Sequence, residues 1–255
     1  MALAVRTGAW SPSGAPLPYL RRVAYLESHG TEWIDTGIIP PLESFLNYFC
    51  LCDFALTRTD INNPIFSCRS KISGGSSYNL WAIGGDRIRF DWKSGVNYAI
   101  KPTIGVIYSF TVNAYGYHKW TLNDIQYPLN EGGRAIRPSS MLLFSTRNGT
   151  DLASVFSWAR IYSFKYQDEF RNQILDLIPV LDLSGRPCFY DEVSAKLFYN
   201  QGEGEFTWGE LDEASNAPSQ LGGGYNRKCV RRSYRRSARP SARFYAHSHR
   251  WEVAA

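Results

Sequence analysis

The chain has 255 residues, of which 44% are hydrophobic and 15% aromatic, so it contains enough apolar side chains for a large core. Its 21 glycines and 13 prolines suit short strands joined by tight turns better than a helical bundle. The net charge is +5, but residues 226–255 hold nine Lys or Arg against one acid, which leaves about −3 for residues 1–225. The basic balance therefore belongs to the C-terminal segment and says little about the partners of the rest.

Residues 1–22 are predicted to form an irregular leader, because glycine and proline recur through them. They lack the apolar stretch of about 7–15 residues that a secretory signal needs. No run in the chain approaches the ~18 apolar residues of a membrane span. We therefore expect synthesis in the cytoplasm without membrane insertion. Assembly into a virion and display outside the cell are both left open.

Short strands are predicted from Val23 onward. Residues 87–93 alternate perfectly, with Ile88, Phe90 and Trp92 on one side and charged residues on the other. This pattern predicts a strand with one buried face and one solvated face. In residues 45–56 both the odd-numbered and the even-numbered positions are largely apolar, which predicts a strand that is covered on both faces.

Further strands are expected at regular spacing along the chain. They are Ile107–Val112, His118–Leu122, Met141–Ser145 and Ala159–Tyr166. Turn-forming pairs separate them, including Gly84-Gly85 and Asn123-Asp124. Only Asp168–Leu177 fits a helical turn or two, which Pro179 would stop. The pattern predicts an antiparallel β-sandwich or barrel.

The five cysteines are odd in number and irregularly spaced: Cys50, Cys52, Cys68, Cys188 and Cys229. The absence of a CxxC pair excludes a zinc knuckle and a thioredoxin-type motif. Because Cys50 and Cys52 lie two residues apart in an apolar run, both are expected on one face of a strand. We predict buried free thiols rather than a disulfide framework.

The chain changes character after Trp208. Residues 210–225 are predicted to be a polar linker that ends in glycines, and residues 226–255 to be an arginine-rich tail. Candidate contacts with an anion or a neighbouring subunit are Arg231, Arg232, Arg235, Arg236 and Arg239. Arginines interleaved with tyrosine can bind phosphates and bases, or can dock on a virion or homo-oligomer neighbour. Nucleic acid therefore stays an alternative partner of the tail.

Three blocks of sequence carry a resemblance to a known family. Residues 25–38 have the sequence YLESHGTEWIDTGI and residues 159–165 the sequence ARIYSFK; LIPVLD, GRPCFYD and LFYNQGEGEF follow between residues 177 and 206. In this order they resemble concanavalin A-like (LamG-like) jelly-roll domains of gut bacteria and their phages. His29 and Trp33 depart from the usual Thr and Tyr of the first block.

The resemblance spans about residues 23–208 and implies an all-β fold, a two-sheet antiparallel jelly-roll β-sandwich. We assign residues 23–209 to this domain, with the leader and the tail outside it. The resemblance implies little about activity, because such folds serve as lectins, glycosidases and virion parts alike.

No residue pattern for catalysis is found. Glycosidases on this fold commonly use a Glu-x-Asp-x-x-Glu run, and the nearest match is Glu210-Leu-Asp212-Glu213, which lacks the final acid. A Gly-x-Ser-x-Gly elbow is absent, and His247 and His249 lack a third metal ligand nearby. We therefore predict that the protein is not an enzyme and needs no metal or cofactor.

Binding residues are sought where aromatic and polar side chains face solvent. Arg87, Arg89 and Asp91 face away from the predicted core on one strand, and Tyr115 and Tyr117 flank a loop glycine. Aromatic rings stack on sugars, while Arg and Asp hold hydroxyl groups. A solvated sheet face and an ordinary turn are the alternative interpretation.

Two functions stay open at the level of sequence. The first is a non-enzymatic surface-binding module, directed at a glycan or another cell-surface ligand, of a gut bacterium or its phage. The second is a structural or decoration protein of a phage virion, with the basic tail as its assembly anchor.

Overall fold

The computed structural model describes residues 17–40, 49–69, 77–93, 95–113, 119–129, 139–147, 153–168 and 170–211. Every regular element in these ranges is a β-strand, and every strand pairing is antiparallel. No helix within the same ranges could cross a membrane. The structure confirms the all-β antiparallel sandwich predicted from the sequence.

An eleven-stranded sheet, here the large sheet, has the order β11-β10-β9-β4-β15-β16-β17-β18. Strand β1 joins it on β16, β2 joins it on β15, and β19 joins it on β2. The bounds are β1 Tyr19–Arg22, β2 Tyr25–His29, β4 Phe49–Leu56, β9 Ile107–Asn113, β10 Lys119–Leu122, β11 Ile125–Pro128, β15 Trp158–Gln167, β16 Gln173–Asp182, β17 Pro187–Asp191, β18 Leu197–Phe198 and β19 Thr207–Gly209.

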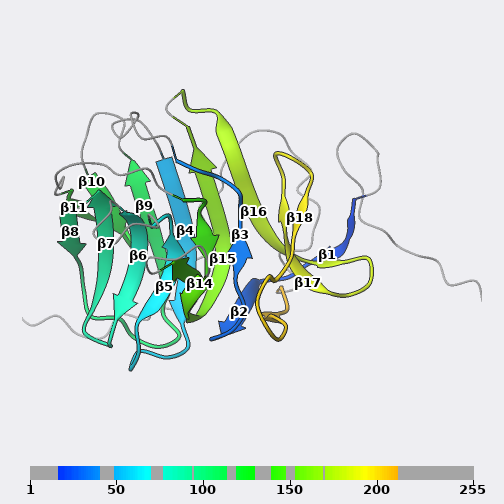
Figure 1. Ribbon diagram of the computed structural model, residues 1–255, viewed down its shortest axis with the longest axis horizontal. Coiled ribbons are helices and arrows are strands. Elements are labelled where there is room, and N and C mark those ends of the chain that lie inside the picture. The colour runs from blue at the N-terminus through cyan, green and yellow to red at the C-terminus, as the bar shows by residue number, and fades with distance from the viewer. Residues whose placement is uncertain are drawn as a thin grey trace, which may run out of the picture. The chain divides into compact units, whose positions relative to one another are not determined.

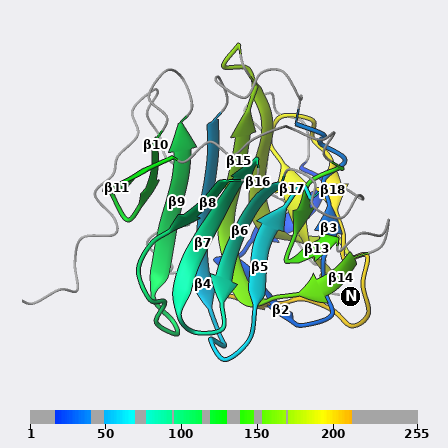
Figure 2. The same ribbon diagram turned by 60° about the vertical axis from the view of Figure 1, so that its left-hand side comes forward.

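A six-stranded sheet, here the small sheet, has the order β3-β12-β5-β6-β7-β8 and lies face to face with the large sheet (Figures 1 and 2). Its strands are β3 Ile34–Asp35, β5 Asn63–Ser67, β6 Ser77–Ile83, β7 Arg87–Lys93, β8 Gly95–Tyr98 and β12 Leu142–Leu143. Strands β13 Ser145–Arg147 and β14 Ala153–Phe156 form a separate hairpin beside β5.

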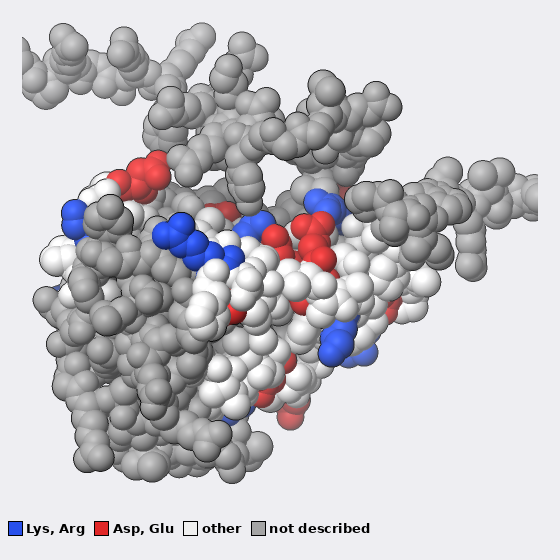
Figure 3. All heavy atoms as spheres, turned by 90° about the horizontal axis from the view of Figure 1, so that it is seen from above, with Lys and Arg blue, Asp and Glu red and all other residues white. Residues whose placement is uncertain are grey.

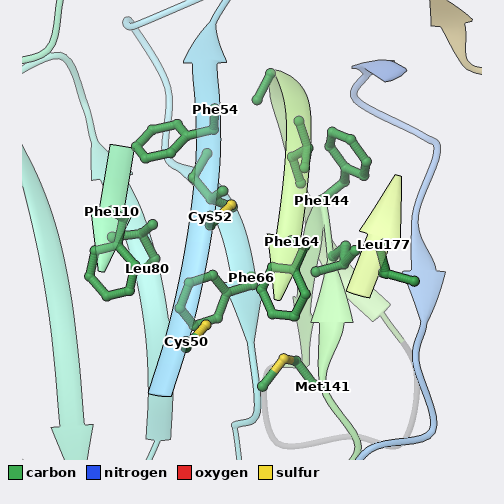
Figure 4. Packing of buried hydrophobic residues seen from close by; sticks show 14 of the residues in the cluster. Cys50, Cys52, Phe54, Phe66, Leu80, Phe110, Met141, Phe144, Phe164 and Leu177 are labelled. Atoms are coloured by element: carbon green, nitrogen blue, oxygen red, sulfur yellow. The ribbon is translucent and has the colours of Figure 1, made fainter. Parts of the chain in front are cut away.

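Aromatic side chains from both sheets interlock in the core. The Phe66 ring of the small sheet lies 5.6 Å from the rings of both Phe110 and Phe164 of the large sheet (Figure 4). The Phe90 ring lies 4.9 Å from Phe110. The predicted core residues Phe90, Trp92, Ile161 and Phe164 are all fully buried. Burial of these large apolar surfaces is the main force that holds the sheets together.

The cysteines are free and buried wherever the structure describes them. Cys50 and Cys52 lie on the core face of β4, as their spacing predicts, and Cys68 and Cys188 are buried elsewhere. Burial raises the pKa of each thiol, that of Cys188 to about 12, so the reactive thiolate is disfavoured. Cys229 lies outside the described residues.

The helical turn considered for Asp168–Leu177 is wrong. Asp168 instead caps a tight turn between β15 and β16, accepting hydrogen bonds from the amides of Phe170 and Asn172 at 2.9 and 2.8 Å. Side chains then alternate along β16, with Leu175 and Leu177 in the core. The period-two burial pattern and the turn chemistry of aspartate together override the weak helical pattern.

Two further expectations need adjustment. The last four residues of the expected leader form β1, where Tyr19 packs on Tyr190 with ring centroids 5.0 Å apart. Strand β4 was expected to be covered on both faces, but Phe49, Leu51 and Asp53 are only half-buried. One face of this strand therefore meets the core and the other is partly solvated.

Candidate ligand-binding surface

Strand β7 alternates in the structure as its sequence predicts. Ile88, Phe90 and Trp92 are fully buried on the core side, so Arg87 and Arg89 project from the opposite, outer face of the small sheet. Asp91 shares that outer face but is only 5% exposed.

A cross-strand row of side chains forms on this outer face. Arg89 lies directly opposite Trp81 of β6 on one side and opposite Tyr98 of β8 on the other. Directly opposite residues in an antiparallel sheet point to the same face. Tyr98 is 49% exposed, and the Arg87 guanidinium lies 4.7 Å above its ring centroid. We call Trp81, Arg87, Arg89, Asp91 and Tyr98 the β6–β8 surface.

The charged groups of the β6–β8 surface are held in ion pairs. The Arg89 Nε donates a hydrogen bond to Asp91 Oδ1, and Arg87 pairs with Asp86 in the adjoining turn. Desolvation by burial raises the pKa of Asp91, although Arg89 and a hydrogen bond from Asn79 oppose that rise. The Asp91 carboxylate therefore stays costly to ionise even beside its arginine.

A buried polar chain continues from Asp91 across the small sheet. Asn79, which bonds to Asp91, accepts a hydrogen bond from the Ser67 hydroxyl at 2.6 Å. The Ser67 hydroxyl also lies 2.6 Å from Thr146 Oγ1 on β13. Ser67, Asn79 and Thr146 are each no more than 2% exposed. The chain thus links β7, β6 and β5, where Asp91, Asn79 and Ser67 lie directly opposite one another, with β13.

Several candidate residues lie outside the described part of the chain. They are Tyr115, Tyr117, Arg231, Arg232, Arg235, Arg236, Arg239, Asp212 and Glu213. Glu210 is described, and both of its carboxylate oxygens accept hydrogen bonds from Arg21, at 2.5 and 2.9 Å. This carboxylate is therefore held by an arginine at the end of the domain.

Metal-ligating side chains do not gather in groups of three or more among the described residues. Asp60 forms two hydrogen bonds with Arg58, at 3.0 and 2.7 Å. The Asn63 side chain donates to the Arg58 carbonyl and accepts from the Trp158 amide, at 2.9 and 2.7 Å. These residues hydrogen-bond within the domain and so stabilise the loop before β5.

The motif residues of the first and third blocks pack against each other. The Trp33 amide donates to Asn200 Oδ1 at 3.0 Å, and the Gln201 amide donates to the Trp33 carbonyl at 2.9 Å. A Cβ on Gly202 would lie 1.9 Å from the Thr31 carbonyl oxygen, so only glycine fits there. These contacts give the motif residues a structural role.

The outer face of the large sheet also carries a charged and aromatic cluster. Arg160 donates to Glu27 at 2.7 Å and stacks 4.6 Å above the Tyr25 ring. A Cβ on Gly209 would lie 2.4 Å from the Tyr25 ring, so this ring packs closely on Gly209. Over the described residues in Figure 3, Lys and Arg lie interspersed with Asp and Glu.

Sequence reasoning missed Trp81 and Tyr98 of the β6–β8 surface, and Asn79 of the buried polar chain. For Trp81 and Asn79 the turn Gly84-Gly85-Asp86 contained the missing signal, because a tight turn fixes the register of its hairpin. Folding the chain back at this turn places Ile83 opposite Arg87 and therefore Trp81 opposite Arg89.

Comparisons with known proteins assign no family. No family model matches the chain, and no curated protein matches it. Among solved structures, the chain is similar to the Ruminococcus gnavus IT-sialidase CBM40 bound to alpha2,3 sialyllactose, with 10% identity and a TM-score of 0.39. The match covers 56% of this chain and 91% of that one. At this score the similarity assigns neither a family nor a ligand to the chain.

Proposed function

We propose that the protein is a non-enzymatic glycan-binding module and that the β6–β8 surface is its binding site. The observation that carries the proposal is the row Trp81–Arg89–Tyr98, which crosses three strands of the outer face. On the sequence resemblance, we place this module in a gut bacterium or its phage.

The chemistry of the row suits a sugar ring. Aromatic rings offer flat apolar faces to the C–H groups of a sugar, while guanidinium groups donate hydrogen bonds to its hydroxyl oxygens. The Arg89 side chain is 31% exposed between Trp81 and Tyr98, so it can reach a ligand on that face. Apolar walls with few fixed polar anchors are typical of small-molecule sites.

The ion pairs of two described carboxylates support binding over hydrolysis. Asp91 is paired with Arg89, and Glu210 is held by Arg21. A glycosidase needs two carboxyl groups that flank one bond and exchange protons with it. Carboxylates that are occupied by arginines fit the role of structural and orienting groups better.

A glycan array followed by calorimetry tests the proposal. Trp81→Ala and Arg89→Ala are each expected to weaken binding of a retained glycan about tenfold or more, since each removes a stacking or hydrogen-bonding group worth about 1.4 kcal/mol. Arg160→Ala is a matched control, because Arg160, like Arg89, pairs with a carboxylate on its sheet surface, but on the large sheet. Equal affinity in all four proteins would reject the site.

A further inference from the structure

Asp91 is a buried carboxylate on the outer face of the small sheet, where a solvated residue would be expected. We infer that Asp91 is a positioning residue, which holds the Arg89 guanidinium in the orientation that meets the ligand. This inference rests on the proposed function and assigns a role to a residue that is itself too buried to make extensive ligand contact.

The buried polar chain fixes Asp91 from the neighbouring strand β6. Asn79 bonds to Asp91 and accepts from Ser67, and Ser67 lies 2.6 Å from Thr146. Each member comes from a different strand, so three neighbouring strands of the small sheet and β13 of the separate hairpin together determine where the carboxylate lies. Hydrogen-bonded groups in such buried networks have few alternative orientations.

Burial of the Asp91 carboxylate costs folding free energy, and packing alone does not explain why a charged residue occupies this position. Burying a carboxylate is unfavourable, and an apolar residue of similar size often gives equal or greater stability than a buried ion pair. Desolvation accordingly raises the pKa of Asp91. A charged residue that is buried against the usual preference, and is hydrogen-bonded to a surface side chain, is a candidate functional residue.

The benefit is a preorganised arginine. A free arginine side chain loses rotamer entropy when a ligand fixes it. Arg89 is already held by Asp91 along its own strand and lies between Trp81 and Tyr98. The Arg89 side chain is therefore already restricted before the ligand binds. Less rotamer entropy is lost on binding, which increases the affinity.

The positioning role of Asp91 predicts that ligand affinity depends on pH. The charged groups that act on it most are Arg89 on β7 and Arg69 just after β5, while β6 contributes the neutral Asn79. As the pH falls through the raised pKa, Asp91 gains a proton and its hold on Arg89 weakens. Binding should therefore weaken on acidification.

Asp91→Asn tests the inference, because asparagine keeps the shape and removes the charge. At pH 7 we expect about tenfold weaker binding of the glycan that the array retains, a melting temperature that is unchanged or higher, and affinity that no longer varies between pH 7 and 4. The Arg89 Nε–H resonance should exchange faster with water than in the wild type. Asp176→Asn, which breaks the 2.6 Å ion pair with Lys165 on the large sheet, should leave affinity unchanged.

The outcomes separate the inference from the proposed function. Loss of binding in Arg89→Ala with full binding in Asp91→Asn would overturn the inference and leave the function standing. Full binding in Arg89→Ala would overturn both. Should Asp91→Asn fail to fold, the wild-type protein decides: affinity that stays constant from pH 7 to 4, while circular dichroism shows a folded domain, contradicts the role of Asp91.

Discussion

Two carboxylates of this domain have opposite pKa shifts, and their surroundings explain the difference. Burial alone would raise the pKa of Glu32, but hydrogen bonds from the amides of His29 and Thr31 and from the Ser28 hydroxyl outweigh it, so the pKa is lowered. Asp91 is also buried, but its partners do not offset desolvation, so its pKa is raised. Glu32 therefore stabilises the fold as an anion, whereas burial disfavours the anion of Asp91 in the fold.

Glu32→Gln should reduce stability in a pH-dependent way. Because the folded-state pKa of Glu32 is lowered, its contribution is complete above the unfolded-state pKa and is lost as the pH falls through the folded-state value. We expect the variant to lose about 1 kcal/mol of unfolding free energy at pH 7, from weakened hydrogen bonds to the carboxylate. Urea denaturation from pH 7 to 3 should show the two proteins converging; a constant difference would contradict this account.

At the scale of elements, tight turns define the hairpins of the small and large sheets. Asn123 and Asp124 both have positive φ angles, 51° and 65°, in the two-residue turn between β10 and β11. The Asn123 side chain also accepts a hydrogen bond from the Ser109 amide at 2.7 Å, which ties this turn to β9. In a two-residue turn in which both residues have positive φ, glycine is preferred over aspartate at the second position.

Asp124→Gly is therefore expected to stabilise the protein by about 0.5–1 kcal/mol, because glycine removes the strain of a positive φ. Asp124→Val should have the opposite effect, since a β-branched side chain is disfavoured in this region. Chemical denaturation of the three proteins checks the order. Equal stability of the glycine and valine variants would show that the turn relaxes freely.

How much of each element the sequence reveals depends on whether the pattern is local. The alternation of residues 87–93 and the glycine turn before it define β7, and the structure confirms both its bounds and its buried face. The turn at Asp168 was missed, because Asp168, Asn172 and the chain around them carry both helix-compatible and turn-forming residues. The turn and the following strand form instead of a helix, because the strand buries Leu175 and Leu177.

At the scale of the whole molecule, the proposed binding surface arises only when strands β6, β7 and β8 pair. Arg89 and Asp91 are visible in the sequence as the polar side of one strand, but Trp81 and Tyr98 join them only through pairing. The buried chain to Thr146 brings together residues up to 79 positions apart, which no local pattern reveals. The sequence thus predicts the strand that carries the site and not its complete composition.

All described strands lie between Tyr19 and Gly209, and the described residues belong to one compact unit. We therefore expect deletion of residues 214–255 to change the melting temperature by less than about 2 °C, the effect of a surface change of about 0.5 kcal/mol. Differential scanning calorimetry of both chains measures this. A large drop would show that the basic segment is an integral part of the fold.

The deletion also tests what the basic segment does. Its local charge predicts that any attachment to nucleic acid through this segment weakens steeply as salt increases. Binding measured in the full chain at low and high salt, and absent from the shortened chain, would support that role. Glycan binding should survive the deletion, since the β6–β8 surface lies wholly within residues 81–98.

The most direct test of the central claim is to locate a bound glycan by NMR. Titration of the labelled protein with an oligosaccharide selected on the array should shift the indole resonance of Trp81 and the Nε–H resonance of Arg89. The indole resonances of Trp158 and Trp208, both on the large sheet, should stay in place. Shifts confined to Trp158, Trp208 or Arg160, with Trp81 and Arg89 unmoved, would contradict a binding site on the small sheet.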